Sequence, residues 1–280
     1  MSNRKDERGN VIKERGKEVF LISLIIVFAI VIWGIAMPDN FSSVANSLFN
    51  FLTGNFGWFY LITMSLFVIF CIWMALSKHG KIKLGKPDEE PEFSTISWFA
   101  MLFSAGMGVG LVFWGVAEPL NHFVNPLNMQ GGTAQAADFA LKTSFFHWGL
   151  HPWASYGVLA LALAYMQFRH DKPAQISSIF IPLIGEGKAR GTIGKAIDIL
   201  AIFATVAGVA TSLGMATLQV TSGFNFLFGI PETNLVRLLV IGVITILFMI
   251  SAITGVDKGI KYLSNVNISL AGLIMVICLI

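Results

Sequence analysis

Three aromatic side chains near the middle of the chain, Trp148, Trp153 and Tyr156, are the first candidates for chemistry. They lie in the segment FFHWGLHPWASYG (145–157). On one continuous α-helix they would stand at relative angles of about 0°, 140° and 80°, and so share one broad face. Aromatic faces that converge inside a membrane favour a cation, above all a quaternary ammonium that cannot donate hydrogen bonds. Packing between helices is the alternative interpretation of the same residues.

A glycine-rich stretch, SAGMGVGLVFWGVAEPLNH (104–122), lies in a second apolar run. Gly106, Gly108 and Gly110 occupy every second position, so a single packing face of a helix does not explain all three. Each glycine disfavours a helix by about 1 kcal/mol relative to alanine, and the pattern therefore predicts a helix that opens. In transporters, such broken helices expose main-chain groups to ions and substrate. Close helix packing and a simple kink are the alternatives.

Hydroxyl and imidazole groups supply the remaining candidate ligands. Hydroxyls in membrane helices usually donate to the carbonyl four residues earlier, and this is expected for most of Thr205, Thr211, Ser212, Thr217 and Thr221. His147 and His151 are spaced i, i+4, but no third metal ligand follows nearby in the sequence. Hydrogen bonding at a helix end is therefore favoured over a metal site.

The elements that position these residues are membrane-spanning helices. The chain has 280 residues, of which 55% are hydrophobic and 12% charged, whereas soluble domains average about 25% charged. The apolar runs predict seven spans, each long enough for a hydrocarbon core of about 30 Å: residues 19–35, 56–76, 97–117, 143–168, 197–220, 235–253 and 263–280. The charged segment 1–18 has no apolar period, which predicts a tail that is disordered or lies on the membrane surface.

The placement of basic residues predicts the orientation. Almost all of the 19 Lys and Arg residues lie in the amino-terminal tail and in every second loop. The positive-inside rule then places the amino terminus in the cytoplasm of a multi-pass cell-membrane protein. The seventh predicted span reaches Ile280 without a polar flank, which indicates an N-terminal piece of a longer protein.

The same pattern argues against two other classes of protein. An enzyme would need clustered ionisable groups at membrane depth, and the predicted spans offer almost none apart from Glu118, close to the outer end of its span. No set of nucleophile, base and orienting group is evident. A seven-helix receptor would have the opposite orientation. No nucleic-acid partner is expected.

At this level of detail the sequence resembles the betaine/carnitine/choline transporter family, and its sodium-coupled glycine betaine members in particular. The resemblance runs from about Phe20 to the last residue. It depends on four segments: FSAGMGVGLVFWGVAEPL (103–120), FFHWGLHPWASYG (145–157), ATVAGVATSLGMATLQ (204–219) and GVDKGIKYLSNVN (255–267).

The resemblance implies an all-α fold of the LeuT-like, inverted-repeat kind. Complete members have twelve helices, of which two extra helices come first and two five-helix repeats follow. The tail would then be residues 1–18, the two extra helices residues 19–76, and the first repeat residues 97–280, with the second repeat missing. Family relatives form trimers, so the resemblance also implies a homotrimer.

The resemblance further implies roles for individual residues. The substrate would contact Trp148, Trp153, Tyr156, Met107, Gly108 and Gly110, and sodium would be bound by Ser104, Met107 and Thr205. Choline-transporting relatives tend to carry Asp at the position of Gly110, so glycine there indicates a zwitterion. Val209 stands where the family pattern has a threonine, which is a departure at the second sodium site.

The resulting hypothesis is a secondary active transporter that imports glycine betaine by sodium symport, for osmoprotection. Sodium is the coupling ion and no cofactor is expected; the partners are the quaternary ammonium substrate and membrane lipid. Choline or carnitine transport by the same fold, and an inactive N-terminal fragment of such a transporter, are the alternatives.

Overall fold

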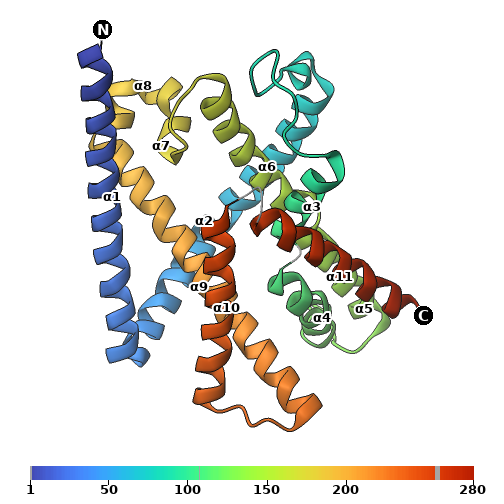
Figure 1. The fold of residues 1–280 in the computed structure, drawn as a ribbon. Coiled ribbons are helices and arrows are strands. Elements are labelled where there is room, and N and C mark those ends of the chain that lie inside the picture. Colours follow the sequence, from blue (N-terminus) through green and yellow to red (C-terminus); the bar gives the residue numbers. More distant parts are fainter. Residues whose placement is uncertain (1, 107, 256–258) are drawn as a thin grey trace. The chain divides into compact units, whose positions relative to one another are not determined.

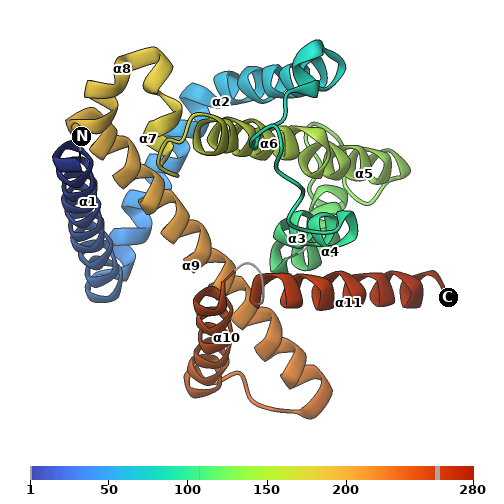
Figure 2. The same cartoon turned by 45° about the horizontal axis from the view of Figure 1, so that its top comes forward.

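The protein is helical throughout the residues that its computed structural model describes (Figures 1 and 2). The model describes residues 2–106, 108–255 and 259–280, with side chains from residue 15 onward in these ranges except at residue 105. The elements are α1 (Ser2–Ala36), α2 (Pro38–Leu76), η1 (Lys78–Lys81), α3 (Thr95–Gly106), α4 (Val109–Val124), α5 (Ala134–Trp148), α6 (Leu150–Ala164), the π-helix η2 (Tyr165–Arg169), α7 (Ile176–Ile179), α8 (Ile181–Arg190), α9 (Thr192–Phe228), α10 (Asn234–Thr254) and α11 (Lys261–Leu279).

The chain divides into two compact units. The first comprises Met1–Glu89 and Phe146–Ala207, and the second comprises Glu90–Phe145 and Gly208–Ile280. In the first unit α2 packs along α6, and α1 contacts α2 across the one-residue connection at Met37. In the second unit α3 packs against α11, as both ribbon views show (Figures 1 and 2).

The helices agree with most of the predicted spans. Five helices of the described chain are long and apolar enough to cross a membrane, namely α1 from Arg15, α2, α9, α10 and α11. The third predicted span is a bent pair, α3 and α4, which raises the number to six if the pair is counted once. The fourth, residues 143–168, is not one helix, because α5 ends at Trp148 and α6 begins at Leu150. The predicted count of seven is therefore not confirmed.

The prediction for the amino-terminal tail gave two alternatives, disorder or a position on the membrane surface, and the second stays a prediction. Residues 2–18 are not irregular but form the beginning of α1, which runs without interruption from Ser2 to Ala36. Lys, Arg and Glu are frequent in this stretch, and these straight-chain residues have high helix propensity even where no apolar face exists. The absence of an apolar period therefore did not mean the absence of a helix.

Helix packing in the first unit depends on small residues. Ala154 on α6 is buried, and the Cys71 thiol of α2 lies 3.7 Å from its carbonyl oxygen. A methyl group added to Gly157, one turn later, would stand 3.8 Å from the same sulfur atom. Helices in lipid gain little from apolar burial against one another, so close backbone approach at small residues becomes the main source of attraction.

A buried polar network joins three segments at one end of the first unit. Asp198 of α9 accepts hydrogen bonds from the Ser177 main-chain nitrogen and hydroxyl, each at 2.8 Å. Arg15 of α1 forms an ion pair with the Asp198 carboxylate at 2.7 Å and donates to the Ser177 hydroxyl at 2.9 Å. The side chains of Arg15 and Asp198 are only 10% and 7% exposed. This network fixes the beginning of α9 to α1 and to the short helix α7.

Candidate functional site

The aromatic candidates belong to the first unit and lie on two successive helices. Trp148 is the last residue of α5, and Trp153 and Tyr156 lie in the first two turns of α6. Gly149 separates the helices with non-helical angles (φ −83°, ψ −133°), and Pro152 falls in the first turn of α6, where its missing N–H costs nothing. The relative angles expected on one continuous helix therefore apply to Trp153 and Tyr156. They were wrong for Trp148, which lies on a different helix.

Two of the three rings that the sequence places on one face, those of Trp153 and Tyr156, lie beside each other. Their ring centroids are 6.2 Å apart and their planes meet at 80°, an edge-to-face arrangement. Both side chains remain open, with 44% and 49% of their surface exposed. An open pair of this kind leaves π faces available to a cation, and an additional ring from Trp148 would have to approach from the separate helix α5.

The glycine-rich stretch opens the helix as predicted. α3 ends at Gly106 and α4 begins at Val109, and the axes of the two helices differ by 56°. Gly108 is extended (φ −107°, ψ −169°) and caps α4, with its carbonyl accepting from the main-chain N–H groups of Leu111 and Val112. Met107, a predicted substrate and sodium ligand, lies outside the described residues. Gly110 lies in the first turn of α4, beside main-chain N–H groups that lack partners within the helix.

Ser104 lies in the last turn of α3, where main-chain carbonyls have no partners within the helix. Its hydroxyl donates to the carbonyl of Ser264 on α11 at 3.1 Å, and Ser264 is itself buried. A cavity of about 380 Å³ lies here, lined by Ser104, Ser264, Asn267 and three apolar residues of α11. Sequence reasoning did not single out Ser264 or Asn267. Their signal was a pair of polar residues at i, i+3 in an apolar helix, which usually faces protein and not lipid.

Thr205, the other predicted sodium ligand, lies on the part of α9 that belongs to the first unit. Its hydroxyl donates to the Ala201 carbonyl at 2.8 Å. Thr217 and Thr221 donate in the same way to the carbonyls four residues earlier, as the sequence predicted for most of these hydroxyls. A donating hydroxyl still has lone pairs for a cation, so the role of Thr205 stays a prediction.

The histidines of the aromatic segment lie on opposite sides of the break at Gly149. His151, in the first turn of α6, places its Nε2 3.5 Å from the Ser65 hydroxyl of α2, and its ring lies 4.6 Å from that of Phe146. His147 is in the last turn of α5. The i, i+4 geometry of one helix therefore does not apply to these two histidines. The contact of His151 with Ser65 agrees with the expected hydrogen bonding at a helix end.

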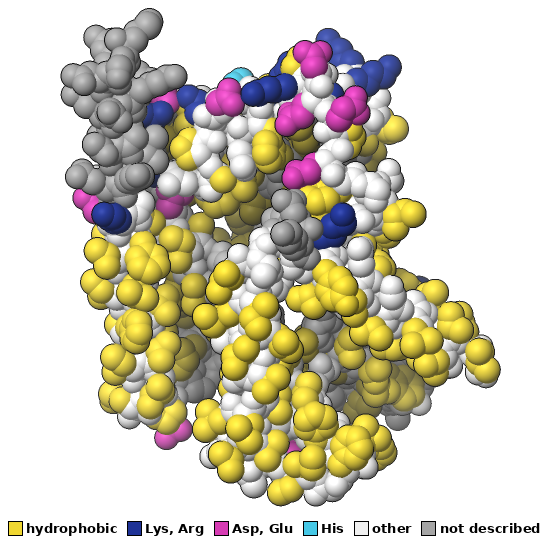
Figure 3. Space-filling model, viewed as in Figure 1, with side chains coloured by type: hydrophobic (Ala, Val, Ile, Leu, Met, Phe, Trp, Pro, Cys, Tyr) yellow, Lys and Arg dark blue, Asp and Glu magenta, His cyan; other side chains and the backbone are white. Residues whose placement is uncertain are grey.

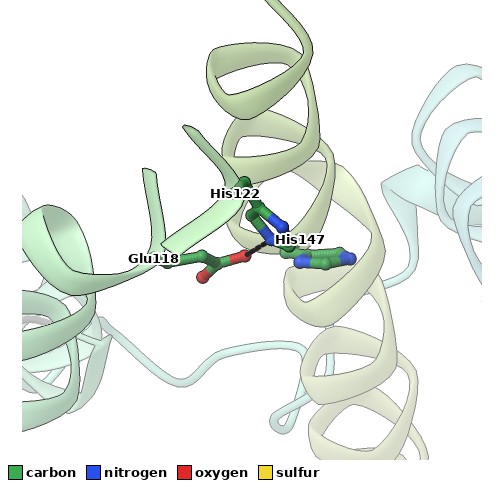
Figure 4. Close-up of side chains that lie close together, drawn as sticks. All are labelled: Glu118, His122 and His147. Atoms are coloured by element: carbon green, nitrogen blue, oxygen red, sulfur yellow. Dashed lines mark ion pairs between the residues drawn. The ribbon is translucent and has the colours of Figure 1, made fainter. Parts of the chain in front are cut away.

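An ion pair on α4, in the second unit, was absent from the sequence predictions. Glu118 and His122 lie one turn apart with Oε1 and Nε2 separated by 3.4 Å (Figure 4). The His122 ring also meets the Phe139 ring edge-on at 6.0 Å. Pro119 lies inside this helix, and Gly115 occupies the position four residues before it, where a proline ring would otherwise crowd the chain. His147, which Figure 4 also labels, belongs to the first unit.

These observations define an all-helical protein with several membrane-spanning helices, one of them opened at glycines. Residues 18–280 match the model of the betaine/carnitine/choline family transporters. The chain therefore belongs to this family.

Curated relatives with similar sequences carry transporter names. A glycine betaine transporter of Bacillus subtilis, OpuD, is 53% identical over 94% of this chain and 51% of its own length. A probable glycine betaine transporter of Desulfitobacterium hafniense is 46% identical over 95% of this chain and 53% of its own. An ectoine/hydroxyectoine transporter of Virgibacillus pantothenticus is 45% identical over 92% and 51%. The chain thus spans about half the length of these relatives.

Proposed function

We propose that the chain forms part of a secondary active transporter that imports glycine betaine together with sodium, and so protects the cell against osmotic stress. The observation that carries this proposal is the family match over residues 18–280, supported by two relatives named for glycine betaine. The open aromatic pair and the opened glycine stretch are the two kinds of group that a trimethylammonium and a carboxylate require.

In this proposal different segments bind the two parts of the substrate. Trp153 and Tyr156, with Trp148, would surround the trimethylammonium group, which offers no hydrogen-bond donor and is attracted by π faces. Main-chain N–H groups at the beginning of α4, near Gly108 and Gly110, would bind the carboxylate, because a helix amino terminus favours an anion.

Sodium would occupy oxygen ligands at the end of α3 and on α9. Ser104 and Met107 would offer carbonyls freed by the break, and Thr205 a hydroxyl at a second site. The membrane potential adds about 2.3 kcal/mol for each charge moved through 100 mV, which provides the driving force for accumulation. The family fold further implies a LeuT-like repeat over residues 97–280, preceded by the pair of helices α1 and α2, with a cytoplasmic amino terminus.

The proposal is tested by uptake of radiolabelled glycine betaine into cells that lack their own osmolyte importers. The chain is expressed alone, and also joined after Ile280 to the remaining part of the Bacillus subtilis relative, because it matches only half of that protein. Uptake by the joined protein is expected with sodium in the medium and is expected to disappear when potassium replaces sodium. Equal uptake in both media would contradict sodium coupling, and uptake of radiolabelled ectoine without uptake of radiolabelled glycine betaine would contradict the substrate.

Replacing Gly110 with aspartate is expected to change substrate preference from glycine betaine toward choline. A carboxylate at the beginning of α4 would repel the carboxylate of the zwitterion and attract a cation that has none. The ratio of kcat/KM for the two substrates should shift by about tenfold or more, the equivalent of ~1.4 kcal/mol. The control is Gly110→Asn, which has nearly the same shape without the charge. An identical shift in the asparagine variant would show that bulk and not charge is responsible.

A further inference from the structure

Two contacts tie one face of α3 to α11, both within the second unit. Just before α3, the Phe93 ring centroid lies 5.8 Å from the Nζ atom of Lys261, the first residue of α11. In the last turn of α3, the Ser104 hydroxyl donates to the Ser264 carbonyl oxygen at 3.1 Å. Ala100 lies one turn before Ser104 on the same face of the helix and is only 2% exposed. α11 therefore holds α3 at both of its ends.

The opposite face of α3 lacks such support in the described chain. Its side chains Trp98, Phe99 and Leu102 are between 40% and 55% exposed. Among the described elements, α11 is the one against which α3 packs extensively, and both ribbon views show the two helices side by side (Figures 1 and 2). The helix that follows the break, α4, runs at 56° to α3. The position of the end of α3 therefore depends on α11.

At the end of α3, a hydrogen bond makes the contact where close packing is incomplete. The cavity of about 380 Å³ lies beside it, lined by Ser104, Ser264, Asn267 and apolar residues of α11. Ser264 is buried, whereas the side of α11 that faces the viewer in Figure 3 is mainly hydrophobic. A main-chain carbonyl within a helix is already ordered, so this hydrogen bond costs rotamer freedom only at Ser104.

Ser104 has two separate tasks under the proposed function. Its carbonyl, which has no partner within the helix, is a proposed sodium ligand. Its hydroxyl fixes the same residue to α11. Binding groups must be held within about 0.5 Å of their productive geometry, so a small shift of the end of α3 is enough to weaken sodium binding.

We propose that α11 positions the sodium-binding end of α3, with the Ser104 hydroxyl as the positioning group and the contact between Lys261 and Phe93 as a second anchor. This inference rests on the proposed function, in which the Ser104 carbonyl binds sodium. Loss of the hydroxyl retains that carbonyl but releases the end of α3 from α11. The affinity for sodium therefore falls, and a higher sodium concentration restores uptake.

The test is the sodium dependence of glycine betaine uptake by the joined protein, measured at saturating glycine betaine. Ser104→Ala is expected to raise the sodium concentration for half-maximal uptake about fivefold, the effect of one hydrogen bond. Ser104→Thr keeps a hydroxyl and should restore most of the affinity. The matched control is Ser269→Ala on α11, which removes an exposed hydroxyl that donates within its own helix to the Asn265 carbonyl at 2.8 Å. This control should show no rise.

A second pair of variants tests the other anchor. Lys261→Gln removes the cation from the Phe93 ring and should raise the same sodium concentration about twofold, whereas Lys261→Arg keeps a cation there and should not. Equal sodium concentrations in Ser104→Ala and Ser269→Ala would overturn this inference and leave the proposed function intact. So would a loss of uptake in Ser104→Ala that no sodium concentration restores, because the hydroxyl would then serve folding and not sodium affinity. Uptake by the unsubstituted joined protein that does not depend on sodium would overturn both.

Discussion

Replacing Asp198 with alanine is expected to destabilise the protein by about 3–5 kcal/mol, because it leaves the Arg15 guanidinium buried without its counter-charge. The carboxylate accepts from the Ser177 nitrogen and hydroxyl and from Arg15, so the substitution removes three hydrogen bonds at once. Both members of the ion pair are at least 90% buried, and water therefore cannot replace the lost partner easily. The thermal unfolding midpoint of the purified chain in detergent measures the effect.

An exposed ion pair provides the control for this measurement. Asp138 pairs with Lys142 one turn away on α5, and the two side chains are 64% and 74% exposed. Asp138→Ala should leave the midpoint almost unchanged, since exposed pairs contribute little. Asp198→Asn keeps the shape of the side chain but not its charge. Its unfolding midpoint should lie between those of Asp198→Ala and Asp138→Ala. A midpoint for Asp198→Ala equal to that of Asp138→Ala would show that the network does not stabilise the fold.

Membrane-spanning helices could be predicted from the sequence because a long apolar run in a chain with so little charge is rarely found outside a bilayer. The runs at 197–220, 235–253 and 263–280 correspond closely to parts of α9, α10 and α11. The opening of the third span was also predictable, since three alternate glycines are costly in any continuous helix. In both cases the decisive information is local in the sequence.

The break at Gly149 was not predicted, although its signals were present. A single glycine followed three residues later by Pro152 is a weak pattern, and the sequence on both sides of it is largely apolar. Hydropathy detects this apolar sequence and not the geometry within it. The consequence was an angular argument that placed Trp148 on the same helix as Trp153.

Contacts between distant segments had no sequence signal at all. Asp198 and Ser177 are 21 residues apart, and Arg15 is 183 residues from Asp198. A lone aspartate near the beginning of an apolar run is typical of an ordinary residue at a membrane surface. The hydrogen bond from Ser104 to Ser264, 160 residues later, likewise joins segments that are distant in the sequence. Such contacts follow from the contact of Arg15 on α1 with Asp198 on α9 and from the packing of α3 on α11, which periodicity within one helix cannot specify.

Replacing Trp153 with leucine is expected to raise the KM for glycine betaine about thirtyfold in the uptake assay, the equivalent of ~2 kcal/mol for a desolvated cation–π contact. Leucine keeps the apolar bulk of the site but has no π face for the trimethylammonium group, and Tyr156 loses its edge-to-face neighbour. Trp153→Phe retains a weaker ring and should cause a smaller loss. The matched control is Trp58→Leu on α2, where the tryptophan is 64% exposed and lies outside the candidate site. Both leucine variants remove one indole from the first unit. An equal rise in KM in the two variants would therefore mean that Trp153 acts only through packing. An unchanged KM in Trp153→Leu would show that Trp153 does not bind the cation.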